Sequence, residues 1–240
     1  MPFSQITPVV GQLQQGYPNP VDTIQREILG TVIPAVDNYF GFGEFMYVQF
    51  PASAAITFGQ VVVISGFGGS AGYSAAVATN AANTGRAIGV AINAVASVAS
   101  VQYGWVQISG NAVIKTTASV AAGTTFGIDA STGGSVAANS AGRQVLNAVS
   151  VAPSTTTVVK TWTLRNGSPI AVAPNVDGLV PGLALSGTGV SGTILSIDYD
   201  NRTVTMSANA SAGGPSSVTA TYTGFIVGQI MRPFLQGAIT

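Results

Sequence analysis

The chain has 240 residues, enough for two modest domains, and it contains neither cysteine nor histidine. Their absence excludes disulfides, thiolate nucleophiles, imidazole bases and the commonest zinc ligands. Charged residues make up 7% of the chain, with eight basic side chains balancing eight acidic ones. Because the basic residues are few and far apart, we expect no contact with nucleic acid.

Long apolar stretches are missing as well. The nearest approach to a membrane-spanning helix, residues 87–101, is interrupted by Asn93, Ser97 and Ser100, whereas such a helix needs about 20 apolar residues. The first residues lack the basic and apolar regions of a signal peptide. We therefore expect a protein that is made in the cytoplasm, does not enter a membrane and, because a nearly uncharged surface favours association, assembles into a larger structure.

Residues 1–40 carry five prolines, Pro2, Pro8, Pro18, Pro20 and Pro34. Proline removes a backbone donor and restricts the residue before it, so the spacing predicts an extended N-terminal arm, with room for one short helix over residues 21–29. The arm is also rich in apolar residues and should be packed against protein. Two arrangements are open: a strand on its own domain, or an extension lying on a neighbouring subunit.

From residue 41 to 154 the chain shows the pattern of short strands. Runs of β-branched and aromatic residues bounded by Gly, Ser, Asn or Pro are typical of strands, and they occur at residues 45–50, 61–64, 87–92, 101–108 and 145–151. Glycine-rich sequences at 66–69 and 132–134 predict turns. The alanine-rich stretch 91–100 has the propensity for a helix as an alternative.

The composition changes near residues 153–157, after which a second β pattern begins. Strands are predicted at 160–164, 202–207 and 218–223, with turns at 181–182 and 200–201. In the last strand Val218, Ala220 and Tyr222 alternate with threonines, which is typical of a half-buried antiparallel strand. Residues 225–230 return to the apolar character of the first domain.

The predicted fold is therefore all-β, with a barrel-like or sandwich core domain, an inserted small β domain and an extended N-terminal arm. The core domain comprises residues 41–154 plus 225–240, and the inserted domain comprises residues 155–224.

Several glycine-punctuated strands resemble those of the head decoration (cement) proteins of tailed phages. They are GRAIGVA at 85–91, YGWVQISG at 103–110, AAGTTFG at 121–127, GRQVLNAV at 142–149 and GFIVGQIMRPF at 224–234. The inserted block is similar to a β module common in phage and bacterial surface proteins, through NVDGLVPG at 175–182, LSGTGV at 185–190 and TVTMS at 203–207.

This resemblance implies a structural virion protein on the capsid exterior, a homotrimer that bridges neighbouring capsomers. Its partners would be the major capsid protein and copies of itself, with no nucleic acid and no membrane. We expect no enzymatic activity, cofactor or metal. The candidate capsid or subunit contacts are apolar side chains of the arm and two residues near the C-terminus: Phe3, Ile6, Val9, Tyr17, Ile24, Ile28, Arg232 and Phe234.

Chemical alternatives to a structural role rest on few residues. Asp198 and Asp200 are the only closely spaced acids and could form a glycosidase pair, but a hairpin turn is the simpler interpretation. Together with Asn201 they could also ligate Ca²⁺, although that ion needs six to eight oxygens. A Ser–Lys dyad would use Lys115 or Lys160.

Aromatic residues offer a further alternative. Trp105, Trp162, Tyr103 and Tyr222 could line a sugar-binding surface, although aromatics at strand positions are more often core or interface residues. The alternative function is therefore a receptor- or glycan-binding module of a tail fibre or adhesin. A polysaccharide-degrading enzyme is the third hypothesis, which the missing histidines and scarce acids disfavour.

Overall fold

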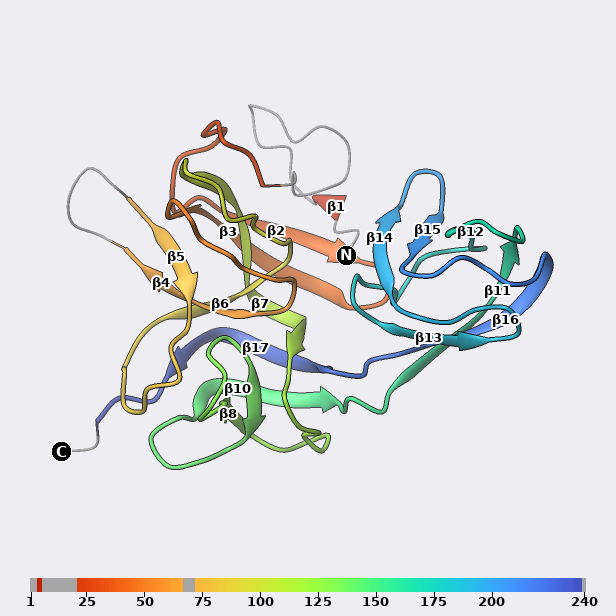
Figure 1. Ribbon diagram of the computed structural model, residues 1–240. Coiled ribbons are helices and arrows are strands. Elements are labelled where there is room, and N and C mark those ends of the chain that lie inside the picture. Colours follow the sequence, from red (N-terminus) through yellow and green to blue (C-terminus); the bar gives the residue numbers. More distant parts are fainter. Residues whose placement is uncertain (1–3, 6–20, 67–71, 239–240) are drawn as a thin grey trace. The chain divides into compact units, whose positions relative to one another are not determined.

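The computed structural model describes residues 4–5, 21–66 and 72–238, and these form an all-β protein without helices (Figure 1). The chain divides into two compact units. The insert unit comprises Ser154–Gly224, which differs by one residue from the inserted domain expected at 155–224. The other described residues belong to the main unit.

The main unit is built on one extended sheet. In the described part of the chain its strand order is β1-β2-β3-β5-β4-β6-β7-β17-β10. The bounds are β1 (Ser4–Gln5), β2 (Val32–Asp37), β3 (Gly41–Phe50), β4 (Val61–Ser65), β5 (Ser74–Val77), β6 (Ile88–Ala91), β7 (Gln102–Lys115), β10 (Val145–Ala152) and β17 (Phe225–Leu235). An additional pairing of β3 with β7 closes strands β3, β5, β4, β6 and β7 into a barrel.

Strand β7 takes part both in the barrel and in the sheet formed with β17 and β10. Its first half pairs with β3, and its second half pairs with β17, which in turn pairs with β10. The barrel is filled by one apolar cluster that includes Phe50, Val62 and Val106. A second cluster, around Phe126 and Ile226, packs beneath β17 and β10 and includes residues of the small sheet of β8 (Phe126–Ile128) and β9 (Val136–Ala138).

The insert unit has a sheet of its own. Within the described residues its order is β13-β16-β11-β12-β15-β14, with β11 (Thr157–Leu164), β12 (Ile170–Val172), β13 (Ala184–Gly187), β14 (Ile194–Asp198), β15 (Thr203–Met206) and β16 (Gly214–Thr221). The two edges meet, because Ile194 N donates to Leu183 O at 3.0 Å and Leu185 N donates to Gly192 O at 2.8 Å. This barrel surrounds buried side chains that include Trp162 and Tyr222.

The all-β prediction is confirmed, and each predicted strand overlaps an observed one. In the strand predicted at 218–223, Val218, Ala220 and Tyr222 are all buried, as the alternation predicts. The turns at 132–134, 181–182 and 200–201 are also present. The turn predicted at 66–69 lies largely outside the described residues.

Neither of the two helices that the sequence left possible is formed. Residues 21–29 form no helix, because their polar groups are bonded elsewhere: Asp22 N donates to Tyr103 O at 2.9 Å, and Asp22 Oδ1 accepts from Ile24 N at 3.1 Å. Residues 91–100 form no helix either, since Val95 N donates to Ile56 O at 2.8 Å and Val95 O accepts from Ile56 N at 3.1 Å.

The expected arm, residues 1–40, differs from the structure over its second half, residues 21–40. Strand β2 lies within residues 1–40 and pairs along its length with β3, from Val32 opposite Met46 to Asp37 opposite Gly41. Residues 21–31 follow the same unit, where Gly30 N donates to Tyr47 O at 2.8 Å. From residue 21 onward this segment is therefore packed on its own domain, the first of the two arrangements left open above.

Candidate docking surface

Strand β17 lies between two partners and exposes one side of its sheet. Gln229 is opposite Asn111 of β7 and Val149 of β10. Along β17, Ile230 is buried while Gln229 and Met231 on either side of it are exposed, as expected of a strand that covers a core with one face only. The exposed side therefore spans three strands.

Two hollows flank Gln229 and Met231 on this side of the sheet. One, of about 360 Å³, also includes Phe40, Phe42 and Asn111, and the other, of about 610 Å³, includes Leu146 and Val149. Since Gln229 and Met231 line both hollows, the two form one continuous surface. We call it the β17 face and define it by Phe42, Leu146, Val149, Gln229 and Met231.

The β17 face is uncharged, and its exposed apolar side chains lie beside polar ones such as Gln229. Met231 is 68% exposed and Phe42 is 54% exposed. None of the described residues that line the two hollows carries a charge. Single exposed apolar side chains are normal, but a contiguous group of them marks an interaction surface. This face can therefore bury apolar area against a partner without desolvating an ion.

The two predicted contacts near the C-terminus lie beside this face. Phe234 is opposite Leu146 in the β10–β17 pair, and both side chains are exposed. Arg232 Nε lies 3.4 Å from Glu44 Oε2, and both side chains are accessible to solvent. An ion pair of this kind contributes little to stability, so Arg232 is held loosely.

The predicted arm contacts have different positions. Ile24 and Ile28 are 59% and 79% exposed, away from any core. Phe3, Ile6, Val9 and Tyr17 lie outside the described residues. A role for these six residues in subunit or capsid contacts stays a prediction.

Asp198 and Asp200, the carboxylates considered for catalysis or calcium binding, lie at the turn that follows β14. Asp198 ends β14 and Asp200 lies in the following turn, so they do not share a strand face. Asp198 Oδ1 accepts from Asn201 N at 3.0 Å and Oδ2 accepts from Asn201 Nδ2 at 2.7 Å. These bonds hold the pKa of Asp198 below its usual value. Over the described ranges no three acidic, histidine or cysteine side chains gather as a metal site would require.

The two candidate lysines are bonded to other groups than serine. Lys115 Nζ donates to Thr57 Oγ1 at 3.2 Å, and Lys160 Nζ donates to Asn175 Oδ1. Burial lowers the pKa of Lys160, while the nearby Asp177 opposes that shift. Among the described residues, the hydrogen bonds of these lysines thus give neither of them the serine partner of a dyad.

The aromatic residues proposed for sugar binding are mostly internal. Trp105, Trp162 and Tyr222 are buried, and Tyr222 Oη donates to Gly178 O at 2.8 Å. Tyr103 is half-buried and stacks on Tyr47 with ring centroids 6.5 Å apart. Trp105, Trp162 and Tyr222 are therefore core residues, the interpretation that the sequence favoured over a sugar-binding surface.

No family model matches the chain, and the searches of curated proteins and of solved structures found no match either. In the part of the chain that is described, no helix is long and apolar enough to cross a membrane.

Sequence reasoning missed the β17 face. The signal was present in part, because Gln229 and Met231 alternate with Gly228 and Ile230 in the sequence. The contribution of Phe42 and Leu146 depends on strand pairing between segments far apart in the chain, which no local pattern reveals.

Proposed function

We propose that this chain is a structural virion protein that decorates and stabilises the exterior of a capsid, docking through its β17 face. The observation that carries the proposal is the continuous, uncharged surface on which Met231, Phe42 and Leu146 are exposed. Such a surface suits a permanent protein contact better than a transient polar one. The resemblance to phage decoration proteins directs the proposal to a capsid.

To stabilise a capsid in this way, the protein mainly needs apolar surface that becomes buried in the contact. Burial contributes about 25 cal/mol per Å² of apolar surface, and a stable interface covers about 1,600 Å² in total. Met231, Phe42 and Leu146 supply the central part of such an area. A repeated contact across capsomer boundaries would oppose the pressure of the packaged genome, with the major capsid protein as the partner.

Self-association belongs to the same proposal. With only eight acidic and eight basic residues, the chain has little charge repulsion to keep copies apart. We expect the purified protein to be a symmetric oligomer, a homotrimer by the resemblance, made in the host cytoplasm before it joins the virion. Multi-angle light scattering at micromolar concentration measures this directly, and a well-behaved monomer would contradict the expected trimer.

The docking test uses capsids that lack this protein. Purified protein is mixed with them, the capsids are sedimented, and the bound copies are counted by quantitative mass spectrometry. We expect saturation at a fixed copy number per capsid. Met231→Glu should reduce binding at least about tenfold, because an unpaired charge then enters the contact.

A matched control is available in the insert unit. Val159 is 60% exposed and lies on β11, and Val159→Glu introduces the same charge at a similarly exposed valine outside the β17 face. We expect this variant to bind like the unaltered protein. If neither variant differs from it, docking does not use the β17 face, and if the unaltered protein does not sediment with capsids, the decoration function itself is wrong.

A further inference from the structure

A separate cavity opens at one end of the main unit's barrel. It has a volume of about 380 Å³ and is lined by residues of six strands together with Gly66, Tyr73 and Ala87. Met46, Ile64 and Ile108 come from barrel strands β3, β4 and β7, and Ile64 and Ile108 belong to the barrel's buried cluster. The cavity, which we call the mouth pocket, is therefore the open end of the barrel core. Barrel mouths are common ligand sites, and this volume lies within the range of small-molecule pockets.

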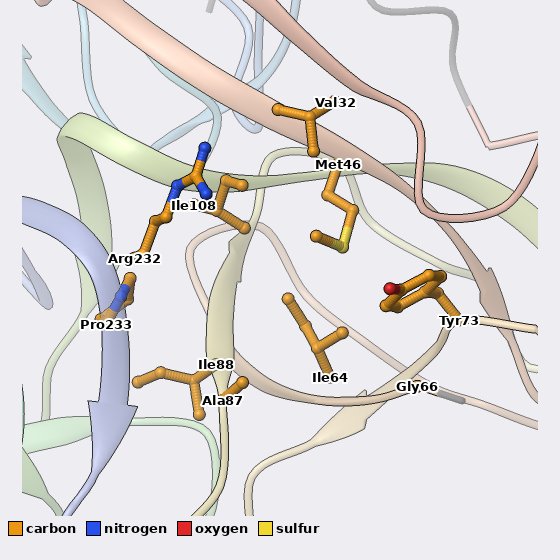
Figure 2. A pocket seen from close by; sticks show the side chains of 10 residues that line it. All are labelled: Val32, Met46, Ile64, Gly66, Tyr73, Ala87, Ile88, Ile108, Arg232 and Pro233. Atoms are coloured by element: carbon orange, nitrogen blue, oxygen red, sulfur yellow. The ribbon is translucent and has the colours of Figure 1, made fainter. Parts of the chain in front are cut away.

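The walls of the mouth pocket are apolar and its ends are polar. Figure 2 shows Ile64, Ile88 and Ala87 on one side and Val32 and Met46 on the other. Tyr73 stands at one end with its hydroxyl toward the cavity, and Arg232 stands at the opposite end (Figure 2). Arg232 is the one charged residue among the described residues that line the pocket.

The wall at Tyr73 is formed in advance of any ligand. A Cβ atom built on Gly30 would lie 2.2 Å from the Tyr73 ring, and one built on Gly66 would lie 2.4 Å from it. The ring therefore fits against two positions that only glycine leaves open. A side chain enclosed in this way loses little further freedom when a ligand binds.

The backbone directs Arg232 to this position. Between the pairs Leu146–Phe234 and Ala148–Ile230 the β10–β17 register shifts, and Arg232 has a φ of 48°. A bulge of this kind redirects a side chain out of strand alternation, and Met231 and Arg232 are accordingly both exposed although they are adjacent. A non-glycine residue in the left-handed region is strained, and residues of this kind cluster at functional sites.

The guanidinium has free donors for a ligand. Its Nε faces Glu44 at 3.4 Å, and among the described residues no hydrogen bond is made by its two terminal nitrogens. Two parallel N–H groups match the two oxygens of a carboxylate. We propose that the mouth pocket binds an unbranched aliphatic carboxylate, with its chain between Ile64, Ile88 and Ile108 and its carboxylate on Arg232. This inference stands apart from the proposed capsid function.

Octanoate is the probe, and octan-1-ol is its uncharged counterpart. Binding is measured by calorimetry and by methyl NMR of protein labelled at isoleucine. We expect saturable binding of octanoate, with shifts of the Ile64, Ile88 and Ile108 methyl signals and none of Ile170 or Ile194 in the insert unit. An absence of saturable binding, or shifts confined to other isoleucines, would overturn the assignment.

Two surface variants test the polar end of the pocket: one should weaken octanoate binding and the other should strengthen it. Arg232→Gln should weaken octanoate binding about tenfold, the loss expected for a charged hydrogen bond, and should leave octan-1-ol binding nearly unchanged. Glu44→Gln removes the competing carboxylate and should tighten octanoate binding about two- to threefold. The control Arg165→Gln, an exposed arginine of the insert unit, should alter neither. Equal octanoate affinities for the unaltered protein and Arg232→Gln would refute the role of Arg232.

A filling variant tests the apolar part. Ala87 lines the pocket and is exposed at its rim, so Ala87→Trp should occupy the cavity and abolish binding of both probes. Its folding is checked by the isoleucine methyl spectrum. A folded Ala87→Trp protein that still binds octanoate shows that the ligand lies elsewhere. Should this variant fail to fold, the surface pair Arg232→Gln and Glu44→Gln decides the proposal.

Discussion

Asp129 shows at the scale of one residue how a loop is held by an anion. Its Oδ1 accepts bonds from Ser131 N at 2.8 Å, Ser131 Oγ at 2.6 Å and Thr132 N at 2.7 Å, and its Oδ2 accepts from Thr117 Oγ1 at 2.7 Å. The bonds from Ser131 and Thr117 depress the pKa of this carboxyl strongly. The carboxylate thus organises the turn between β8 and β9.

We predict that this residue makes the main unit sensitive to acid. The pKa of Asp129 is lower folded than unfolded, where it is about 3.9. Its contribution is therefore complete above that value and is lost as the pH falls toward the folded pKa. Asp129→Asn should be less stable than the unaltered protein at pH 7 and nearly equal to it in strong acid. Urea unfolding at a series of pH values measures the difference, in a Trp162→Phe background so that fluorescence reports on Trp105 alone. Glu27→Gln is the control, and the same dependence of the unfolding free energy on pH in all three proteins would contradict the prediction.

Trp162 carries a second residue-scale prediction. It is buried, and over the described residues its Nε1 has no hydrogen-bond partner. Trp162→Phe keeps most of the apolar burial and removes an unpaired donor, so we expect a change below about 1.5 kcal/mol. Trp162→Ala leaves a cavity and should cost about 3–5 kcal/mol. Circular dichroism during urea unfolding checks both, and similar costs for the two variants would show that the indole ring is not the core of the insert unit.

Among the elements, β7 depends on one glycine. Gly110 is opposite Gly43 of β3 and Ile230 of β17, at the point where β7 changes partners. Its φ is 94°, and a Cβ there would lie 2.2 Å from Phe42 O. The close approach of β3 therefore requires glycine.

We predict that Gly110→Ala destabilises the main unit by about 3 kcal/mol or more, because backbone strain and a steric clash act together. Gly41 separates the two effects, since its φ is 79° and a Cβ there would meet nothing within 4 Å. Gly41→Ala should cost only about 1–2 kcal/mol. Thermal unfolding compares them, in a Trp162→Phe background so that fluorescence reports on Trp105 alone. Equal losses of stability would remove the argument from close packing.

Strand β7 also shows how much of a secondary-structure element could be predicted from the sequence. The alternation in residues 101–108 predicts the first half of β7, and the observed strand continues to Lys115. Ser109 and Gly110 have the composition of a turn, yet here the glycine permits close approach instead of reversing the chain. Similarly, the prolines of residues 1–40 predicted an extended arm, but Pro34 is accommodated in β2 beside β3. Strand existence follows from local periodicity, whereas partner choice is set by distant segments.

The candidate site was less predictable than the strands for the same reason. Arg232 and Phe234 were identified from the sequence, but the shift in register that exposes Arg232 depends on Asn147 and its neighbours in β10. The mouth pocket combines residues from Val32 to Pro233. No single segment contains enough of either surface to indicate it.

At the scale of the whole molecule, the chain segments next to the two junctions pair with each other within each unit. In the main unit Ala152 of β10 pairs with Val227 of β17, on either side of the insertion. In the insert unit Thr157 pairs with Thr221, and Tyr222 N donates to Thr156 O at 3.0 Å. Each unit also has its own buried core and one of the chain's two tryptophans, Trp105 or Trp162.

We therefore predict that the two units fold independently. Replacing residues 154–224 with a short Gly-Ser bridge should preserve the β10–β17 pair, because loop closure between strands that already pair costs little. The shortened protein should show the same Trp105 unfolding midpoint as full-length Trp162→Phe, which reports on the main unit alone.

Isolated residues 154–224 should give a dispersed NMR spectrum and a cooperative Trp162 transition. A shortened protein that lacks a cooperative Trp105 transition would show that the main unit needs the insert unit to fold; if it folds but no longer sediments with capsids that bind the full chain, the insert unit holds part of the docking surface.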